Sequence, residues 1–207
     1  MTVDHEILEH SVTEVDFTLF HSNWVPSSPR FVVCGSSLAG DGLLKVYSLA
    51  GKGVSEVSSC KRRKAIRCGT FDSSSLEDRY YVTGDFGGGL AVWDLEEMDQ
   101  PIEEVGDAHS DMINCVDGDR DNGLVVTGGR DGEVRVWDRR DLRQCVVNMA
   151  PRAGDTRHDT WTVSTRDHVI CEGYSNGDIK MFDVRASAVT LEGNFWGGVL
   201  NRDDCRC

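Results

Sequence analysis

The sequence predicts an all-β fold made of four repeated strand units, and three observations support this prediction. An aromatic residue ends an alternating strand at positions 47, 93, 137 and 182, with spacings of 46, 44 and 45 residues. Each of these strands follows a turn in which Gly stands beside Asp, Asn or another Gly, the residues that tight turns favour. Apolar and polar residues alternate along the strands, as in a half-buried β-strand. A period of about 45 residues is typical of a β-propeller, in which each repeat forms a four-stranded blade.

The four turn–strand segments share one design. They cover residues 41–47, 87–94, 131–138 and 176–183. The second and third end in Trp-Asp, the ending that gives WD repeats their name. We therefore predict four antiparallel blades whose aromatic residues occupy equivalent third-strand positions.

The third repeat is the most complete. By resemblance to WD repeats, His109, Thr127, Asp131 and Trp137 form a buried structural tetrad joined by hydrogen bonds. The indole, hydroxyl and imidazole all need partners when they are buried, and the carboxylate ends the chain of hydrogen bonds. A His–Asp pair can also serve catalysis, but no nucleophile accompanies this one, so the structural interpretation is favoured.

The other repeats lack the full tetrad. Gly87 and Asn176 stand where the third repeat has Asp131, Phe182 and Tyr47 replace Trp, and the first repeat has an insertion at 36–40. Their turns and period survive, so they should form blades. We expect the third blade to be the most rigid.

Charge and composition restrict the partners. The chain has 207 residues and a formal net charge of −13, which argues against nucleic acid or an anionic membrane as the main partner. One basic run, residues 61–64, is interpreted either as a solvated loop or as a minor docking patch. No apolar run is long enough for a membrane span, and the N-terminus lacks the features of a signal peptide.

The cysteines indicate a reducing, intracellular location. None of the eight has CxxC spacing, and Cys68, Cys115 and Cys171 fall on expected strands, where free Cys packs as a small apolar residue. Cys205 and Cys207 are two possible soft-metal ligands, too few to predict a site. We expect no metal and no cofactor.

No motif of a known catalytic class is present. The glycines of 84–89 have the wrong spacing for a dinucleotide-binding loop, and a strand follows them rather than a helix. We therefore expect a non-enzymatic, protein-binding molecule.

Segments outside the general repeat pattern make the resemblance more specific. They are residues 23–26, 66–71, 83–88, 148–149, 161–163 and 173–180. On these segments the chain resembles the axonemal dynein assembly factor family of WD-repeat proteins. The resemblance implies a cytoplasmic adaptor that associates with a co-chaperone complex of RuvB-like ATPases and prefoldin-like subunits and assists preassembly of dynein subunits.

The same resemblance implies a seven-bladed ring, of which this chain would supply four blades and remain open. The expected organisation is an N-terminal segment at 1–16, blades at 17–186 and a non-repeat tail at 187–207. A truncated isoform, a reading-frame change and a genuine short form all fit such a tail. Apolar blade faces left open at the ends should promote association.

A substrate receptor of a cullin-type ubiquitin ligase is the alternative function. Trp137-Asp138-Arg139-Arg140 matches the Trp-Asp-x-Arg ending that such receptors use for docking, and the segment ending at Arg185 is a weaker copy. Arg suits such a contact because its guanidinium makes planar, bidentate hydrogen bonds. Arg140 and Arg185 are therefore candidate partner-binding residues.

Further candidates are expected around the central opening of the propeller, where blade-end loops meet. They are Phe86, Arg130 and Ser175 in turns, and Arg67, Asn114 and Trp161 at the start of inner strands. Exposed aromatic and Arg side chains are the best hot-spot candidates. Phe86 and Trp161 can equally be blade-packing residues.

Overall fold

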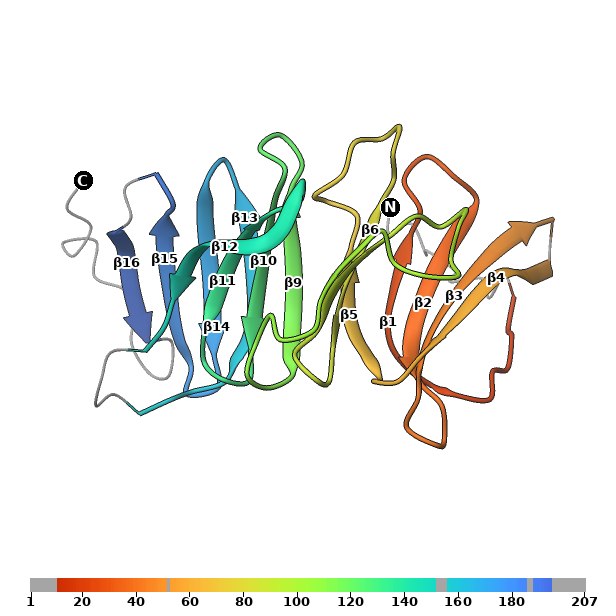
Figure 1. The fold of residues 1–207 in the computed structure, drawn as a ribbon, viewed down its shortest axis with the longest axis horizontal. Helices are drawn as coiled ribbons and strands as arrows, with labels where there is room; N and C mark the ends of the chain where they lie inside the picture. Colours follow the sequence, from red (N-terminus) through yellow and green to blue (C-terminus); the bar gives the residue numbers. More distant parts are fainter. Residues whose placement is uncertain (1–10, 52, 152–155, 186–187, 195–207) are drawn as a thin grey trace, which may run out of the picture.

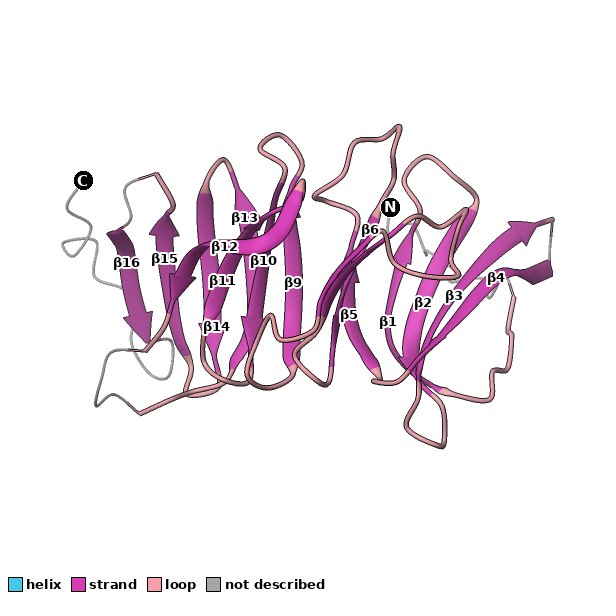
Figure 2. Ribbon diagram, in the orientation of Figure 1, coloured by secondary structure: helices cyan, strands magenta, loops and turns pink. Residues whose placement is uncertain are grey.

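The computed structural model describes residues 11–51, 53–151, 156–185 and 188–194, and these contain strands and loops but no helix (Figure 2). The strands form four antiparallel four-stranded sheets. The first blade contains β1 (Thr18–Trp24), β2 (Arg30–Ser36), β3 (Gly42–Ala50) and β4 (Gly53–Arg62). The second contains β5 (Ile66–Thr70), β6 (Tyr81–Asp85), β7 (Leu90–Trp93) and β8 (Glu103–Val105). The third contains β9 (Ile113–Asp119), β10 (Leu124–Gly129), β11 (Val134–Asp138) and β12 (Asp141–Met149). The fourth contains β13 (Thr160–Arg166), β14 (Val169–Tyr174), β15 (Asp178–Asp183) and β16 (Ala188–Asn194).

The aromatic residues that set the period occupy equivalent positions. Each lies on the third strand of its blade and pairs with the same place on the second strand. The pairs are Tyr47 with Phe31, Trp93 with Tyr81, Trp137 with Val125 and Phe182 with Ile170. The prediction of four blades with equivalent aromatic positions is confirmed.

The blades lie side by side in sequence order, with the first and fourth at opposite ends of the row (Figure 1). The apolar core lies between neighbouring sheets, as three clusters of buried residues. Leu44 and Val46 of β3, for example, cluster with Tyr81 and Trp93 of the second blade. Stability therefore depends on blade stacking, because burial of apolar surface contributes roughly 25 cal/mol per Å².

Alternation along each strand sends neighbouring side chains to opposite faces of the blade. Trp93 thus belongs to the cluster that it shares with the first blade, and Trp137 to the one that it shares with the second. Tyr47 points the other way from Leu44 and Val46 and packs with Phe17 and Val33 on the outer face of the first blade. In the second and third blades the aromatic residue therefore packs toward the preceding blade, and Tyr47 faces away from the row.

Residues 11–15 of the N-terminal segment lie over this outer face. A hollow of about 210 Å³ separates Ser11, Thr13 and Val15 from the sheet. Its floor consists of Leu19, Phe31, Val33, Tyr47 and Val54. Leu19 keeps 49% of its surface exposed, so the segment covers this apolar face only in part.

Every innermost strand carries one extra residue at the same place. The pairing of the first with the second strand shifts there in all four blades, which is the signature of a β-bulge. The extra residues are Phe20, Arg67, Asn114 and Trp161. A bulge re-aims the side chain it carries, so these four residues form an equivalent set around the inner side of the row.

One predicted boundary needs correction. The blades were expected to end at 186, but β16 (Ala188–Asn194) pairs with β15 and completes the fourth blade. Its sequence carries no turn–strand–aromatic signature, because an outermost strand takes no part in that pattern. Residues 195–207 and residues 1–10 lie outside the described part of the chain.

Candidate functional site

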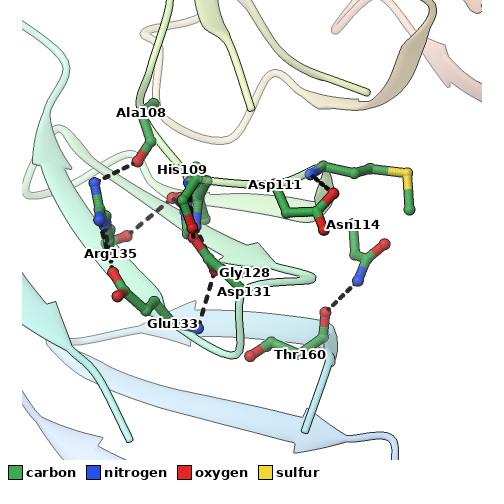
Figure 3. Close-up of polar contacts among 12 residues, drawn as sticks. Ala108, His109, Asp111, Asn114, Gly128, Asp131, Glu133, Arg135 and Thr160 are labelled. Atoms are coloured by element: carbon green, nitrogen blue, oxygen red, sulfur yellow. Dashed lines mark hydrogen bonds and ion pairs between the residues drawn. The ribbon is translucent and has the colours of Figure 1, made fainter. Parts of the chain in front are cut away.

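The third blade contains a continuous hydrogen-bond chain of four side chains, of which Figure 3 labels His109 and Asp131. His109 Nδ1 lies 3.0 and 3.1 Å from the two carboxylate oxygens of Asp131, and Nε2 lies 2.7 Å from Thr127 Oγ1. Trp137 Nε1 donates to the same hydroxyl oxygen at 2.9 Å. Since the indole can only donate, the Thr127 hydroxyl can donate to Nε2, and Nδ1 then carries the hydrogen given to Asp131.

Asp131 is held as a carboxylate. Burial favours its protonated form, but the hydrogen bond from His109 and the backbone N–H groups of Glu133 and Ser110 outweigh burial and lower its pKa below the ordinary range. All four tetrad side chains are buried, so no substrate can reach them. The arrangement fixes the turn between β10 and β11 to the loop that precedes β9.

The second blade keeps half of this chain. Trp93 Nε1 donates to Thr83 Oγ1 at 2.9 Å, which repeats the Trp137–Thr127 contact at the same sequence separation. The Arg62 guanidinium lies over the Trp93 ring, 5.4 Å from its centroid. Sequence reasoning missed the Thr–Trp bond, although the shared ten-residue spacing was available as a signal.

The first and fourth blades have no hydroxyl at the position of Thr127, and each has a different residue there. The fourth blade has Glu172 at the position of Thr127, buried and accepting a hydrogen bond from the Tyr174 hydroxyl. The first blade has Val33 there, and Tyr47 stacks on Phe31 with ring centroids 5.5 Å apart. Polar bonding around the aromatic residue thus differs in every blade.

Three predicted partner-binding residues occupy one equivalent turn position. The backbone N–H of each turn residue donates to the carbonyl of the residue immediately before an inner strand, at 2.8–2.9 Å. The three turn residues are Phe86, Arg130 and Ser175. All three are exposed, and the Arg130 guanidinium lies 3.9 Å from the Asp159 carboxylate. The turns therefore present their side chains at the same end of each blade as the bulges.

The bulge residues differ in exposure. Trp161 is 50% exposed, whereas Asn114 is only 5% exposed and donates from Nδ2 to the Thr160 carbonyl at 2.9 Å (Figure 3). The expectation that Asn114 faces the opening is wrong, because its amide joins the third blade to the fourth. Arg67 lies over the Phe20 ring at 5.8 Å, and Phe20 contacts Phe86 with centroids 5.2 Å apart.

The two candidate docking arginines differ in their bonding. Arg185 forms two ion-pair hydrogen bonds with Asp183, at 2.7 and 3.0 Å. The exposed guanidinium of Arg140 has no hydrogen bond or ion pair with any described residue. In both segments the Asp of the motif accepts the backbone N–H two residues later.

The six cysteines within the described ranges are free thiols. Over those same ranges, no three His, Cys, Asp or Glu side chains are arranged to hold a metal ion. No helix suitable for spanning a membrane occurs in the part of the chain that the structure describes.

Comparison with known proteins agrees with this geometry. A family model described as "WD domain, G-beta repeat" matches residues 102–138, the segment that contains the whole tetrad. With its four described blades, the chain has the fold of a WD-repeat β-propeller.

Relatives of this WD-repeat chain extend over almost all of it. It is 41% identical over 95% of its length to a Xenopus tropicalis protein named Dynein axonemal assembly factor 10. Proteins of the same name from Homo sapiens and Chlamydomonas reinhardtii are each 38% identical over 95% and 94% of the chain. The resemblance to axonemal dynein assembly factors is confirmed. The WD-repeat chain spans 57–58% of the length of these relatives.

Proposed function

We propose that this chain is a non-catalytic scaffold in the assembly of axonemal dyneins. The observation that supports the proposal is its 37–41% identity, over 95% of the chain, to vertebrate proteins named Dynein axonemal assembly factor 10. The third-blade His–Asp pair gives no reason to prefer an enzyme, since both side chains are buried and committed to neighbouring groups.

The finer proposal concerns location and partners. It places the chain in the cytoplasm, bound to a co-chaperone complex of RuvB-like ATPases and prefoldin-like subunits, with dynein subunits as clients. This part rests on the resemblance drawn from the sequence. An acidic surface, with a formal net charge of −13, suits protein partners better than nucleic acid or membrane.

The contact surface proposed for these partners lies where turns and bulges meet. Phe86, Trp161 and Arg130 are exposed there, and Ser175 completes the row of turn residues. Aromatic and Arg side chains contribute most to protein interfaces when a partner removes them from water. Phe86 and Trp161 have room for such burial, being 40% and 50% exposed.

Affinity purification tests the scaffold proposal. The full chain, tagged and expressed in ciliated cells, should co-purify with RuvB-like ATPases and dynein heavy chain. Phe86→Ala with Trp161→Ala should reduce that recovery, whereas Val146→Ala, an exposed residue of β12, should not. Equal recovery from all variants would remove this surface from the proposal, and absence of both partners from the wild-type sample would remove the function.

A second candidate function has one observation in its favour. The exposed Arg140 guanidinium, unpaired among the described residues, is available for docking to the adaptor of a cullin-type ubiquitin ligase. Arg185 is less suited because Asp183 already holds it. Capture of the chain by purified ligase adaptor, with loss of capture on Arg140→Ala, would favour the receptor function over the scaffold.

A further inference from the structure

The basic run at 61–64 borders a hollow in the second blade. Lys61 and Arg62 end β4, and Arg63 and Lys64 lead toward β5. The hollow has a volume of about 420 Å³ and opens to solvent. It is lined by the four cations together with Asp85, Gly87, Glu104 and Gly106.

This hollow lies where the third blade has its His–Asp pair. Gly87 occupies the sequence position of Asp131 and contributes no side chain. Arg62 lies over Trp93, so a cation lies beside the second-blade indole. A narrower recess reaches Thr83 and Trp93 from the same side. Because this repeat has Gly87 in place of the tetrad Asp, the hollow beside Arg62 is not filled by a carboxylate side chain.

Two of the four cations are already paired. Lys61 Nζ lies 2.7 Å from Asp41 Oδ2, and Arg62 binds Glu104. Arg63 and Lys64 are exposed and form no ion pair or hydrogen bond through their side chains with the described residues. These two charges are available to an incoming anion.

The carboxylate of Asp85 is the remaining acidic group in the hollow. Its Oδ1 accepts the backbone N–H groups of Gly87 and Gly89, at 2.7 and 2.8 Å. Those bonds fix Asp85 in the turn, and no ion pair joins it to Arg63 or Lys64 within the described part of the chain. The hollow therefore keeps a local excess of positive charge in a chain whose net charge is −13.

The turn that lines the hollow also carries an aromatic residue. Phe86 lies between Asp85 and Gly87, and its N–H donates to the carbonyl of Ala65, the residue after Lys64. Its ring contacts Phe20, which in turn lies under the Arg67 guanidinium. An apolar contact surface and free cations are thus adjacent.

We propose that this second-blade hollow binds an acidic peptide segment of a partner protein. A carboxylate or phosphoryl group enters between Arg63 and Lys64, and an apolar side chain of the same segment packs on the Phe20–Phe86 pair. The inference rests on the proposed scaffold function and specifies the chemistry of a partner. Opposite charges at an interface chiefly give specificity and fast association.

Fluorescence anisotropy with the full chain tests the inference. The probe is a fluorescein-labelled peptide of glutamates around one phenylalanine; a second peptide replaces the central glutamates by phosphoserine, and a third replaces all glutamates by lysine. The acidic peptides should bind, and their affinity should fall as the salt concentration rises, because exposed charges are screened. The tighter of the two acidic peptides identifies the preferred anion. Binding of the lysine peptide with equal affinity would overturn the proposal.

Matched variants locate the contact. Arg63→Glu with Lys64→Glu should weaken binding at least about tenfold, as loss of buried-interface charge pairs does. Arg157→Glu with Arg166→Glu makes the same charge change on two exposed residues, just before and at the end of β13, and should leave affinity unchanged. Equal weakening by both pairs would show a general charge effect and sink the proposed site.

Gly87→Asp provides a variant that fills the hollow. A Cβ at Gly87 would lie 3.2 Å from Cγ of the flexible Lys64 side chain, and the φ angle of Gly87 is not in the left-handed region, so the chain should fold. The new carboxylate should pair with the free cations and abolish peptide binding. Full binding by a folded Gly87→Asp chain would contradict the inference. If the wild-type chain binds neither acidic peptide but still recovers the dynein assembly partners, this site is removed and the scaffold proposal stands.

Discussion

At the scale of the residue, one strand position distinguishes the four blades. It lies on the second strand beside the period-setting aromatic residue and is occupied by Val33, Thr83, Thr127 and Glu172 in chain order. Of these four residues, only Thr127 forms hydrogen bonds with both an indole and an imidazole. A hydroxyl suits this place because it accepts one hydrogen bond and donates another.

Removing the tetrad carboxylate should destabilise the chain. Asp131→Ala leaves His109 Nδ1 and two backbone N–H groups without their acceptor in a buried site, at a cost of about 1–3 kcal/mol in the free energy of unfolding. Equilibrium denaturation measures the loss. Asp111→Ala, which removes an exposed carboxylate from the neighbouring loop, serves as the control and should change stability by less than about 0.5 kcal/mol. Similar values for both variants would argue against the tetrad.

The Asp131 contribution should also depend on pH. Its pKa in the folded chain is lowered, against the effect of burial, by the bonds from His109 and from backbone amides. The stabilisation is therefore complete above the unfolded pKa of about 4 and is lost as the pH falls through the lower folded value. The difference in unfolding free energy between wild type and Asp131→Ala, measured from neutral to acid pH, should stay constant and then shrink in this range. A difference that grows on acidification would contradict this assignment.

At the scale of the element, the strands with a signature were the predictable ones. Glycine turns and the aromatic period located β3, β7, β11 and β15, because the turn and the packing both demand particular residues there. The outermost strand of a blade requires no particular residues, and β16 was therefore assigned to the tail. Its pairing with β15 depends on backbone bonds that almost any sequence can make.

The candidate site was predictable in part for the same reason. Residues that close a hydrogen-bond chain, such as His109 and Asp131, follow from spacing and bonding capacity. The hollow beside Gly87 did not follow, since it depends on where Arg62 lies relative to Trp93. The burial of Asn114 between two blades could not be predicted either. Asn114 is the extra residue of a β-bulge, and a bulge is recognised only from the pairing register of the two strands.

Cysteine chemistry can report on individual blades. Cys34, Cys68 and Cys115 lie in the first, second and third blades, and burial raises the pKa of each thiol, that of Cys34 to about 12. Alkylation requires the thiolate. These three should react with iodoacetamide much more slowly than the partly exposed Cys60 in the native chain, and all at similar rates in denaturant, as followed by peptide mass spectrometry. Fast native labelling of Cys115 would show that the third blade opens readily.

At the scale of the whole molecule, the outer face of the first blade is only partly covered. Trp93 and Trp137 pack toward the preceding blade, whereas Tyr47 of the first blade lies on the outer face, beside a hollow of about 210 Å³ that the N-terminal segment borders. Apolar surface of this kind favours association. The outer face of the first blade is therefore a place where this chain should meet another protein surface or a further blade.

The chain of 22.9 kDa should accordingly elute above its monomer mass and bind a hydrophobic dye. Leu19→Lys with Val54→Lys places charges on the outer face of the first blade and should lower both signals, because both residues line its hollow. Val57→Lys with Val146→Lys, at exposed sites elsewhere, is the control. Light scattering that finds a monodisperse wild-type monomer without dye binding would show that the face is adequately covered.

The recurring bulge on the inner strands has a consequence for how such proteins diverge. The extra residue shifts the pairing register by one position, and the two strands pair regularly on either side of it. Phe20, Arg67 and Trp161 thus vary in chemistry while the blades around them keep one plan. A lineage can exchange the side chain at a bulge without rebuilding its strands, so new binding preferences require few substitutions. Asn114 marks the limit of this freedom, since its amide also joins two blades and its replacement would weaken the scaffold.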